Sequence, residues 1–435
     1  MGELMPRRLD ARAKNFASDF VALIESKRDA EDDVSRDVKA IIAEVRARGD
    51  AALIALSHQF DRVELSAETL RVSADDIAAA WRTCAQDLKD ALSLAASRIE
   101  AYHRRQMPKD DSFTDDTGAT LGWRWGALSS VGLYVPGGTA SYPSSVLMNA
   151  IPARVAGVTR IAMVTPASGG AINPLTLVAA RIAGVSEIYR IGGAQAIAAL
   201  AYGTPTIKPV DKIVGPGNAY VAAAKREVFG RVGIDSIAGP SEILVVADGA
   251  NDPAWIAADL LSQAEHDASS QSVLITDDSA FADSVAKEVE RQLAVLPRRD
   301  IAARAWQDHG AIIVVDKLAD APALVDQIAP EHLEIATADP PAFFARVKHA
   351  GAVFLGRHTP EAIGDYIAGP NHVLPTSRTA RFSSGLSVLD FLKRTSVLSC
   401  DAEALSRLGP AALALAEAEG LAAHGRSIAI RLNRK

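Results

Sequence analysis

The stretch from Asp211 to Asp248 constrains the fold of this chain more than any other, because it joins two buried strands through a glycine turn and a helix. A β-branched run at 212–214 predicts a short strand, Gly-Pro-Gly at 215–217 predicts a turn, and Asn218 opens a helix. An apolar run at 243–247 predicts the second strand. Such a glycine turn directs backbone N–H groups and the positive end of the helix dipole at one point, which suits a phosphate or pyrophosphate.

The same alternation of strands and helices extends on both sides of this stretch. Further strands are predicted at 131–135, 160–165, 187–191, 272–276, 311–315 and 352–355. Helices are predicted at 174–183, 194–201, 253–265, 279–293 and 318–328. Alternating strands and helices with short glycine turns indicate parallel sheets, whose ligands bind beyond the carboxyl ends of the strands. The sequence therefore predicts an α/β fold of two Rossmann-like lobes with parallel or mixed sheets, and a seam near residue 240.

The two ends of the chain have a different texture. Residues 10–107 are predicted to be helical, because apolar residues recur at spacings of three and four. Within them, Ser73 and Asp76 form a capping-box variant in front of one long helix with a single apolar stripe. A segment rich in Ser, Thr and Arg at 376–385 is typical of a linker, and a mostly helical tail is predicted beyond it, up to Arg431.

Composition excludes several classes of protein. The 435 residues carry 46 basic and 53 acidic side chains, and this net charge of −7 argues against nucleic acid or an anionic membrane as the main partner. Only Cys84 and Cys400 occur, so neither a disulfide framework nor a cysteine zinc site is expected. No signal-peptide core is evident, and no run of about 18 uncharged apolar residues occurs. A cytoplasmic enzyme is therefore expected.

Several side chains suited to metal binding or proton transfer lie near the ends of predicted elements. Gln263 and His266 are three residues apart near the end of a helix, so both project from one face. Glu331 and His332 follow Pro330 at the end of another helix. Further candidates are Asp365 and His372 in a loop-like segment, and Glu419 and His424 in the tail. A Gln, two His and an Asp form a set of nitrogen and oxygen ligands that suits Zn²⁺, although Mn²⁺ or Co²⁺ could also bind it.

Each of these residues also has an ordinary structural explanation. A single His is more often a hydrogen-bonded core or surface residue, and Asp365 taken alone is more often a turn or cap residue. Gly215 and Gly217 are more often turn formers than phosphate binders, and Tyr220 stands where a dinucleotide fingerprint has its third glycine. Spacing alone therefore does not establish a site.

Seven longer motifs, taken together, resemble those of histidinol dehydrogenase. They are GLYVPGGTASYPSSVLMNAIPARVAGV (132–158), IGGAQAIAALAYGT (191–204), DKIVGPGNAYVAAAKR (211–226), AGPSEILVVAD (238–248), DLLSQAEHD (259–267), IAPEHLEI (328–335) and GDYIAGPNHVLPT (364–376). They follow the family's order from about residue 30 to His424, without a departure at the positions that matter.

The resemblance implies a function and a domain organisation. Histidinol dehydrogenases oxidise L-histidinol to L-histidine through the aldehyde with two NAD⁺ and one water, at the end of histidine biosynthesis. The implied division is a helical arm at 1–27, a first lobe at 28–133 plus 241–382 with the metal and catalytic residues, an NAD-binding second lobe at 134–240, and a helical tail at 383–435. The family's two chains interlock, so the tail of one protomer is expected to complete the active site of the other in a homodimer.

The resemblance also assigns roles to individual residues. Gln263, His266, Asp365 and His424 are expected to hold one Zn²⁺, and Glu331 and His332 to act as the acid/base pair. Substrate is expected to contact the metal ligands and His332, together with Ser241, His372 and Glu419. Contacts with NAD are expected from Tyr134, Gln195 and Asn218.

Two other functions use some of the same residues. A zinc hydrolase could employ the metal set with Glu331 as its base, but it does not need the glycine turns of the second lobe. A two-lobed binding protein that closes on a small ligand has no use for Glu331 and His332 as an acid/base pair. Both remain alternatives to the dehydrogenase.

Overall fold

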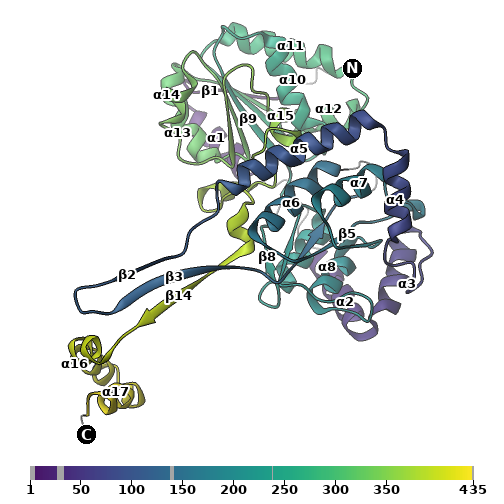
Figure 1. Cartoon of the computed structure of the whole chain (residues 1–435). Coiled ribbons are helices and arrows are strands. Elements are labelled where there is room, and N and C mark those ends of the chain that lie inside the picture. Colours follow the sequence, from purple (N-terminus) through teal and green to yellow (C-terminus); the bar gives the residue numbers. More distant parts are fainter. Residues whose placement is uncertain (1–4, 27–33, 138–141, 238, 434–435) are drawn as a thin grey trace.

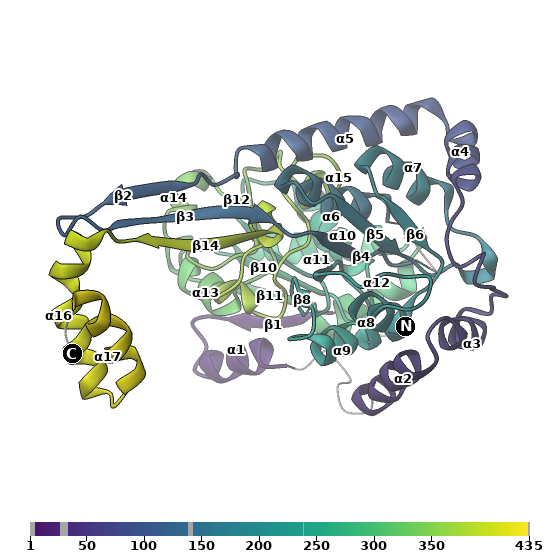
Figure 2. The ribbon, with the colours of Figure 1, turned by 60° about the horizontal axis from the view of Figure 1, so that its bottom comes forward.

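The computed structural model of the chain describes residues 5–26, 34–137, 142–237 and 239–433. These residues form a six-stranded parallel sheet, a five-stranded parallel sheet and a three-stranded antiparallel sheet. The two parallel sheets lie in separate lobes, and the antiparallel sheet extends from the body as a long arm (Figures 1 and 2). The predicted α/β class with parallel sheets is confirmed, whereas the third sheet was not predicted.

The six-stranded sheet forms the core of the first lobe. Its order is β1 (Arg7–Asp10), β11 (Ala311–Val314), β10 (Gln271–Thr276), β9 (Glu242–Ala247), β12 (His332–Ala336) and β13 (Ala352–Leu355). One face packs on α10 (Pro253–Ala264), α11 (Ser279–Leu293) and α12 (Arg299–His309), and the other on α1 (Phe16–Ile24), α13 (Ala321–Ile328) and α14 (Pro340–Phe344). All residues of β9 are buried, because helices cover both faces of a parallel sheet.

The five-stranded sheet forms the core of the second lobe. Its order is β6 (Glu187–Tyr189), β5 (Arg160–Val164), β4 (Ser130–Tyr134), β7 (Lys212–Val214) and β8 (Gly233–Ile234). One face packs on α2 (Val34–Arg48), α3 (Asp50–Asp61), α8 (Gly193–Tyr202) and α9 (Ala219–Val228). The other packs on α4 (Ala74–Thr83), α5 (Gln86–Arg104), α6 (Pro143–Ala156) and α7 (Pro174–Ala183). The helical N-terminal region therefore covers both faces of this second sheet.

Local sequence rules account for most of these boundaries. Asn173 caps α7 through a hydrogen bond to the backbone N–H of Leu175, and Gly184 ends that helix in the left-handed conformation. Ser73 forms the predicted capping box with Asp76. The predicted long helix is nevertheless two helices, because Cys84 leaves α4 with extended backbone angles.

Several strands escaped prediction. Within the arm expected to be helical, Arg7–Asp10 form β1, which pairs with β11 at the edge of the first sheet. The boundary expected between residues 133 and 134 falls inside β4, whose strand partners β5 and β7 both belong to the second sheet. The expected boundary between residues 27 and 28 lies outside the described residues. So does residue 138, in the glycine turn that follows the predicted strand at 131–135. The full domain division remains a prediction.

The antiparallel arm carries the C-terminal tail away from both lobes. Its strands are β2 (Asp111–Thr114), β3 (Thr120–Ala127) and β14 (Leu392–Ser399), with β14 paired to β3 along its whole length. The tail that follows is α16 (Ala402–Ala418) and α17 (Ala422–Ala429). The tail was expected to be mostly helical, but β14 becomes a strand because β3 offers it eight paired positions.

The remaining regular elements are short. They are α15 (Glu361–Tyr366) and the 3₁₀ turns η1 (Ser168–Gly170), η2 (Leu318–Asp320), η3 (Thr379–Arg381), η4 (Val388–Phe391) and η5 (Ile430–Leu432). Among the described residues, no helix combines the length and the apolar character needed to cross a membrane.

Candidate active site

A cavity of about 860 Å³ lies between the two lobes. From the second lobe it is lined at the carboxyl ends of strands, by Pro136 after β4 and by the turn at 216–218 after β7. From the first lobe it is lined at the amino ends, by Ser241 before β9 and by His332 at the start of β12. The expectation that ligands sit beyond the carboxyl ends therefore fits the second lobe only.

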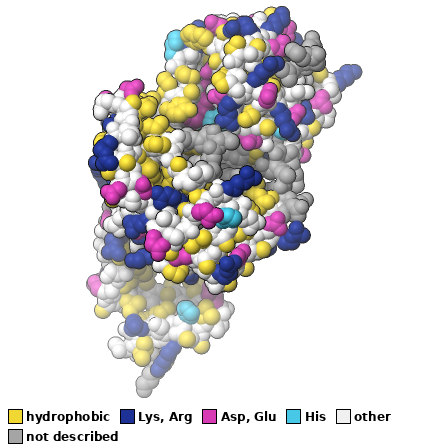
Figure 3. Space-filling view, turned by 90° about the vertical axis from the view of Figure 1, so that its right-hand side faces the viewer, with side chains coloured by type: hydrophobic (Ala, Val, Ile, Leu, Met, Phe, Trp, Pro, Cys, Tyr) yellow, Lys and Arg dark blue, Asp and Glu magenta, His cyan; other side chains and the backbone are white. Residues whose placement is uncertain are grey.

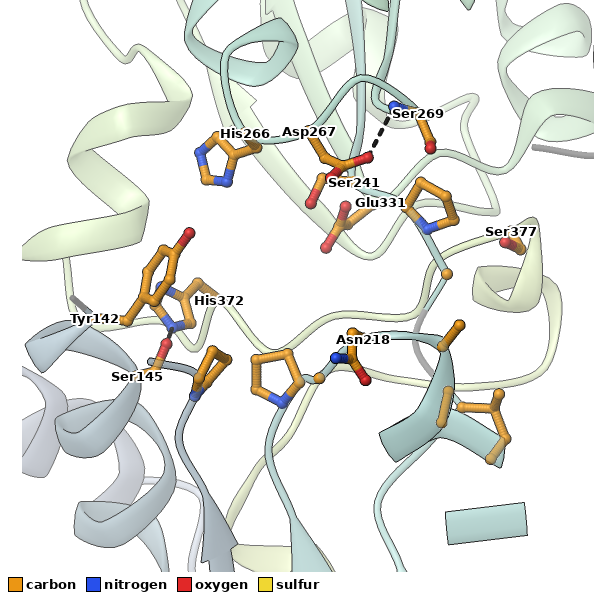
Figure 4. Close-up of a pocket in the computed structure, with 18 of the residues that line it drawn as sticks. Tyr142, Ser145, Asn218, Ser241, His266, Asp267, Ser269, Glu331, His372 and Ser377 are labelled. Carbon is orange, nitrogen blue, oxygen red and sulfur yellow. Dashed lines mark hydrogen bonds between the residues drawn. The ribbon is translucent and has the colours of Figure 1, made fainter. Parts of the chain in front are cut away.

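The cavity collects most of the residues singled out in the sequence. Those that line it are Asn218, Ser241, Gln263, His266, Glu331, His332, Asp365 and His372. In the close-up, Ser241, His266 and Glu331 lie on one side of the cavity and face His372 and Asn218 across it (Figure 4). Side chains separated by more than 100 residues are brought together, because the two lobes meet at the seam near residue 240.

Two of these residues differ from their predicted local structure. Glu331 and His332 were expected in irregular backbone after a helix, but His332 is the first residue of β12 and its neighbours in the sheet are Ile243 and Ala352. Asp365 was expected in a loop, but it lies on the short helix α15. A buried strand gives His332 a more rigid support than a loop gives, because strand partners on both sides hold its backbone.

His332 is oriented by one backbone carbonyl. Its Nδ1 lies 2.9 Å from the carbonyl oxygen of Glu242, which can only accept a hydrogen bond. Nδ1 therefore carries a proton, and a neutral His332 has its lone pair on Nε2. That Nε2 is buried and has no hydrogen-bond partner among the described residues. The free atom of the imidazole is thus the one that faces the carboxylates of α15.

Two buried carboxyl groups and one partly buried carboxyl group surround this imidazole. Glu331 Oε2 is 3.6 Å from Nδ1 and accepts a hydrogen bond from the backbone N–H of Glu242 at 2.9 Å. On the other side, Nε2 is 3.7 Å from Glu361 Oε1 and 3.8 Å from Asp365 Oδ1. Ionisation of more than one of these acids exceeds the single positive charge of His332, so a cation bound here favours the ionised carboxylates.

The charges in this cluster shift one another's pKa. Burial raises the pKa of Glu331 to about 8, although His332 opposes the shift. Burial by itself lowers the pKa of His332, but Glu331, Asp365 and Glu361 together raise it to about 10. Burial also raises the pKa of Glu361, to about 7. Any further positive charge placed among these carboxylates lowers the pKa of His332 and makes its Nε2 available as a base.

Asp365 and His372 link this cluster to the second lobe. His372 Nδ1 donates to the backbone carbonyl of Asp365 at 2.9 Å, and its Nε2 is 3.4 Å from Ser145 Oγ at the start of α6. Burial lowers the pKa of His372 and of His266, so both imidazoles are favoured in their neutral form. Burial opposes ionisation of Asp365, but His332, His372 and His266 hold its pKa below the usual value.

The donor atoms in the cavity fit a divalent cation. His332, Glu361 and Asp365 can bring one ligand atom each within 4.8 Å of one another. Gln263 Oε1, His332 Nε2 and Glu361 Oε1 are all buried without a hydrogen-bond partner among the described residues. Unpaired buried polar atoms are costly, and nitrogen and oxygen donors around neutral imidazoles suit zinc. The predicted ligands Gln263, His266 and Asp365 line the same cavity.

The tail residues do not reach this cavity within one chain. Glu419 follows α16 and His424 lies on α17, and both side chains are exposed. The arm holds these helices far from the seam between the lobes (Figures 1 and 2). The tail also exposes apolar side chains, including Leu415, Leu421 and Ile430, and stands apart from the body in the space-filling view (Figure 3).

The expected NAD contacts divide into two groups. Asn218 lines the cavity and caps α9 by accepting a hydrogen bond from the backbone N–H of Val221. Tyr134 and Gln195 are buried at the turn before α8, where Tyr134 Oη accepts a hydrogen bond from the backbone N–H of Gly193 at 3.1 Å. They do not line the cavity, so a direct contact with a cofactor remains a prediction for both.

Glu361 and the two acids next to it, Glu334 and Asp259, were not predicted from the sequence. Glu361 Oε2 accepts a hydrogen bond from Ser262 Oγ at 3.1 Å, next to the predicted ligand Gln263. Glu334 lies under Glu361 on β12 and forms a hydrogen bond with Asp259 of α10. The available sign was Glu334, an acidic residue two positions after His332 on a buried strand, because apolar side chains normally fill such positions.

Comparisons with known proteins agree on one family. The histidinol dehydrogenase family model matches residues 24–432. The histidinol dehydrogenase of Rhodospirillum rubrum is 66% identical over 431 residues and that of Mesorhizobium japonicum 65% over 419 residues, covering 99% and 96% of this chain and 99% and 97% of the relatives. The crystal structure of the histidinol dehydrogenase of Elizabethkingia anophelis superposes with a TM-score of 0.94 at 37% identity, covering 100% of this chain and 99% of the other.

The buried pair Asp259 and Glu334 predicts a stability that falls as pH rises. Burial raises the pKa of Asp259 to about 6, and that of Glu334 lies well above its usual value. Their protonated forms therefore stabilise the fold fully below about pH 4, and this contribution is lost as pH rises through about 6. Asp259→Asn removes one of the two acids, so we expect a smaller fall in melting temperature between pH 5 and pH 7.5.

Calorimetric melting curves at several pH values measure this effect. Glu290→Gln on the exposed face of α11 is the matched control, and its melting temperature should follow that of the parent protein at every pH. An Asp259→Asn profile that falls as steeply as the parent's contradicts the prediction.

Proposed function

The chain belongs to the histidinol dehydrogenase family, and from this membership and the cavity between the lobes we propose that it oxidises L-histidinol to L-histidine through the aldehyde. Each turnover consumes two NAD⁺ and one water, as the last steps of histidine biosynthesis. The observation that supports it most is the buried His332, with Nε2 free and three carboxyl groups around it. We also propose a cytoplasmic location, where the free Cys84 and Cys400 stay reduced.

The acidic cluster suits the charge of the substrate. Histidinol carries a protonated amine at neutral pH, and the carboxylates of Glu361 and Asp365 lie where an ammonium group or a metal cation lowers the local excess of negative charge. Such a cation also lowers the pKa of His332, so the base becomes active when the site is filled. His372 and Ser241, on opposite sides of the cavity, complete the proposed substrate contacts within this chain.

His332 is the proposed base for both oxidations. Each oxidation removes a hydride from carbon and a proton from oxygen, first from the alcohol and then from the hydrated aldehyde. Because Nδ1 is held by the carbonyl of Glu242, the proton is accepted at Nε2 both times. Asn218, Tyr134 and Gln195 are the proposed contacts that would hold NAD⁺ at the turns of the second lobe, where each of two NAD⁺ would supply the acceptor for one hydride.

Glu331 is the proposed acid/base for hydration of the aldehyde. Its carboxyl borders the cavity beside His332, and its pKa of about 8 allows it to take up and release a proton near neutral pH. Ionised Glu331 takes a proton from water as the water oxygen adds to the aldehyde carbon. The aldehyde oxygen takes the proton that Nε2 of His332 received in the first oxidation, so the hydrate is neutral and His332 is again a base. The backbone N–H of Glu242 holds the second oxygen of the carboxyl group in place, which fixes the direction of transfer.

Zinc is the proposed resident metal, with Gln263, His266 and Asp365 from one chain and His424 from the partner as ligands. When bound, zinc would supply a positive centre that helps these residues orient the substrate in the cavity. The unpaired Gln263 Oε1 and the neutral imidazole of His266 support this assignment.

A homodimer with shared active sites is the proposed assembly. Glu419 and His424 are exposed on a tail that the arm carries away from its own cavity, and the tail has an apolar surface that a second chain can bury. In an isologous dimer each tail reaches the site of the other chain. Glu419 then joins the substrate contacts and His424 the metal ligands.

The overall reaction is tested with purified protein, histidinol and NAD⁺. We expect two NADH for each histidinol consumed, with histidine as the product. Removing metal with a chelator should abolish turnover, and adding Zn²⁺ should restore part of it. Full activity in rigorously metal-free protein argues against a role of the metal in binding substrate. Consumption of histidinol without formation of NADH supports a hydrolase instead.

The separate roles of the two catalytic residues are tested by half-reactions. His332→Asn should slow the oxidation of both histidinol and histidinal by on the order of 10²–10⁴-fold, because one base serves both steps. Glu331→Gln should mainly slow the oxidation of histidinal, which needs hydration first. Single-turnover measurements with each substrate decide this, and equal losses in both steps for Glu331→Gln count against its role with water.

The shared site is tested by mixing two inactive chains. His424→Ala lacks a tail ligand and His332→Ala lacks the base, so each homodimer should be inactive. Heterodimers should regain up to about one active site in two, because one site then receives the intact tail and the intact base. Absence of activity in verified heterodimers assigns His424 to the site of its own chain.

A further inference from the structure

The turn between β7 and α9 is held by a buried ion pair that the proposed chemistry does not use. Lys225 of α9 and Asp235 after β8 form a salt bridge, and their side chains are 3% and 4% exposed. Taking two charges out of water is costly, and replacing such a pair with apolar residues often leaves stability unchanged or improves it. Stability alone is therefore a poor reason for this pair.

Both charges are directed at the backbone of the same residue of the turn. The backbone N–H of Gly215 donates to Asp235 Oδ2 at 2.7 Å, and the carbonyl of Gly215 accepts from Lys225 Nζ at 3.1 Å. The remaining contact is the one between Lys225 Nζ and Asp235 Oδ1. The two polar groups of one glycine are thus fixed by two side chains that in turn fix each other.

The backbone of Gly215 has little freedom to move, because its conformation is one that favours glycine and a neighbouring strand lies close to it. Its φ of +111° lies in the region that favours glycine, and a Cβ there would lie 2.1 Å from the carbonyl oxygen of Tyr134. The turn is therefore pressed against the end of β4, the neighbouring strand. Residues 216–219, which follow at once, line the cavity and lead into the N-terminus of α9.

We propose that Lys225 and Asp235 are positioning residues for NAD⁺, because they fix the two peptide units that flank Gly215 and thereby hold the turn at 215–217 and the start of α9 against the cavity. This inference rests on the proposed function, since it assumes that a dinucleotide binds at this edge of the second sheet. Turn peptides and a helix N-terminus interact with a bound phosphate only from a narrow range of positions. Among the described residues, the side chains of Lys225 and Asp235 form hydrogen bonds only with Gly215 and with each other. They are therefore well suited to keep the turn within that range of positions.

The test removes both charges at once. The double variant Lys225→Met/Asp235→Leu loses the three contacts without leaving a cavity at either position, and it is expected to fold because an apolar pair is often tolerated at such sites. We expect its Kd for NAD⁺, measured by titration calorimetry on the zinc-loaded dimer, to rise about tenfold or more. Metal content and the KM for histidinol should stay within about twofold, because the first lobe is not altered.

A second ion pair in the same lobe provides the matched control. Arg160 and Glu187 pair at 3.0 Å with side chains 20% and 18% exposed, near the amino ends of β5 and β6 and so at the opposite edge of the sheet. Arg160→Met/Glu187→Leu should leave the Kd for NAD⁺ unchanged. If both double variants weaken NAD⁺ binding equally, the effect is a general loss of lobe stability and the inference is wrong.

The outcomes separate this inference from the proposed function. If the parent protein does not bind NAD⁺, the proposed function fails. If the parent binds NAD⁺ and the Lys225→Met/Asp235→Leu variant binds it equally well, only the positioning role fails. Should that variant not fold, Asp235→Asn takes its place, because it keeps an oxygen for the N–H of Gly215 and weakens the interaction with Lys225. A raised Kd for NAD⁺ with an unchanged melting temperature then supports the positioning role, and an unchanged Kd rejects it.

Discussion

The placement of buried Glu331 and Glu361 and partly buried Asp365 around the single imidazole of His332 is the interaction on which the rest of the site depends. Carboxylates in a low-dielectric interior repel one another, so Glu331 and Glu361 remain partly protonated at neutral pH. In the proposed function, an ammonium group or a metal ion takes the place of these protons. Substrate binding is then linked to the activity of the base, since the same cation lowers the pKa of His332.

The cavity gains its chemistry from the opposite polarity of the two sheets. The second sheet presents the carboxyl ends of β4 and β7, with a glycine turn and a helix N-terminus that suit a phosphate. The first sheet presents the amino ends of β9 and β12, where backbone N–H and C=O groups orient Glu331 and His332. In the proposed function, a cofactor side and a substrate side thus face each other across one seam.

In the proposed dimer, the arm and tail of one chain contribute residues to the active site of the other. β14 is a strand only because it pairs with β3, and the pair is long enough to carry α16 and α17 clear of both lobes. A tail with exposed Leu415, Leu421 and Ile430 gains stability by burying them against another surface. The proposed dimer supplies that surface and at the same time brings Glu419 and His424 to a cavity that they cannot reach in their own chain.

The sequence by itself determined the strand–turn–helix units, because glycine turns, caps such as Asn173 and Ser73, and apolar runs such as 243–247 are local signals. Its motifs also determined the family. Only the tertiary structure decided which sheet each strand joins, so β1, β12 and β14 escaped prediction: their partners lie far away in sequence. It also decided the electrostatics of the site. Glu361 has no local feature that marks it, and its role arises from burial beside His332, a property of packing within the first lobe and not of any single segment.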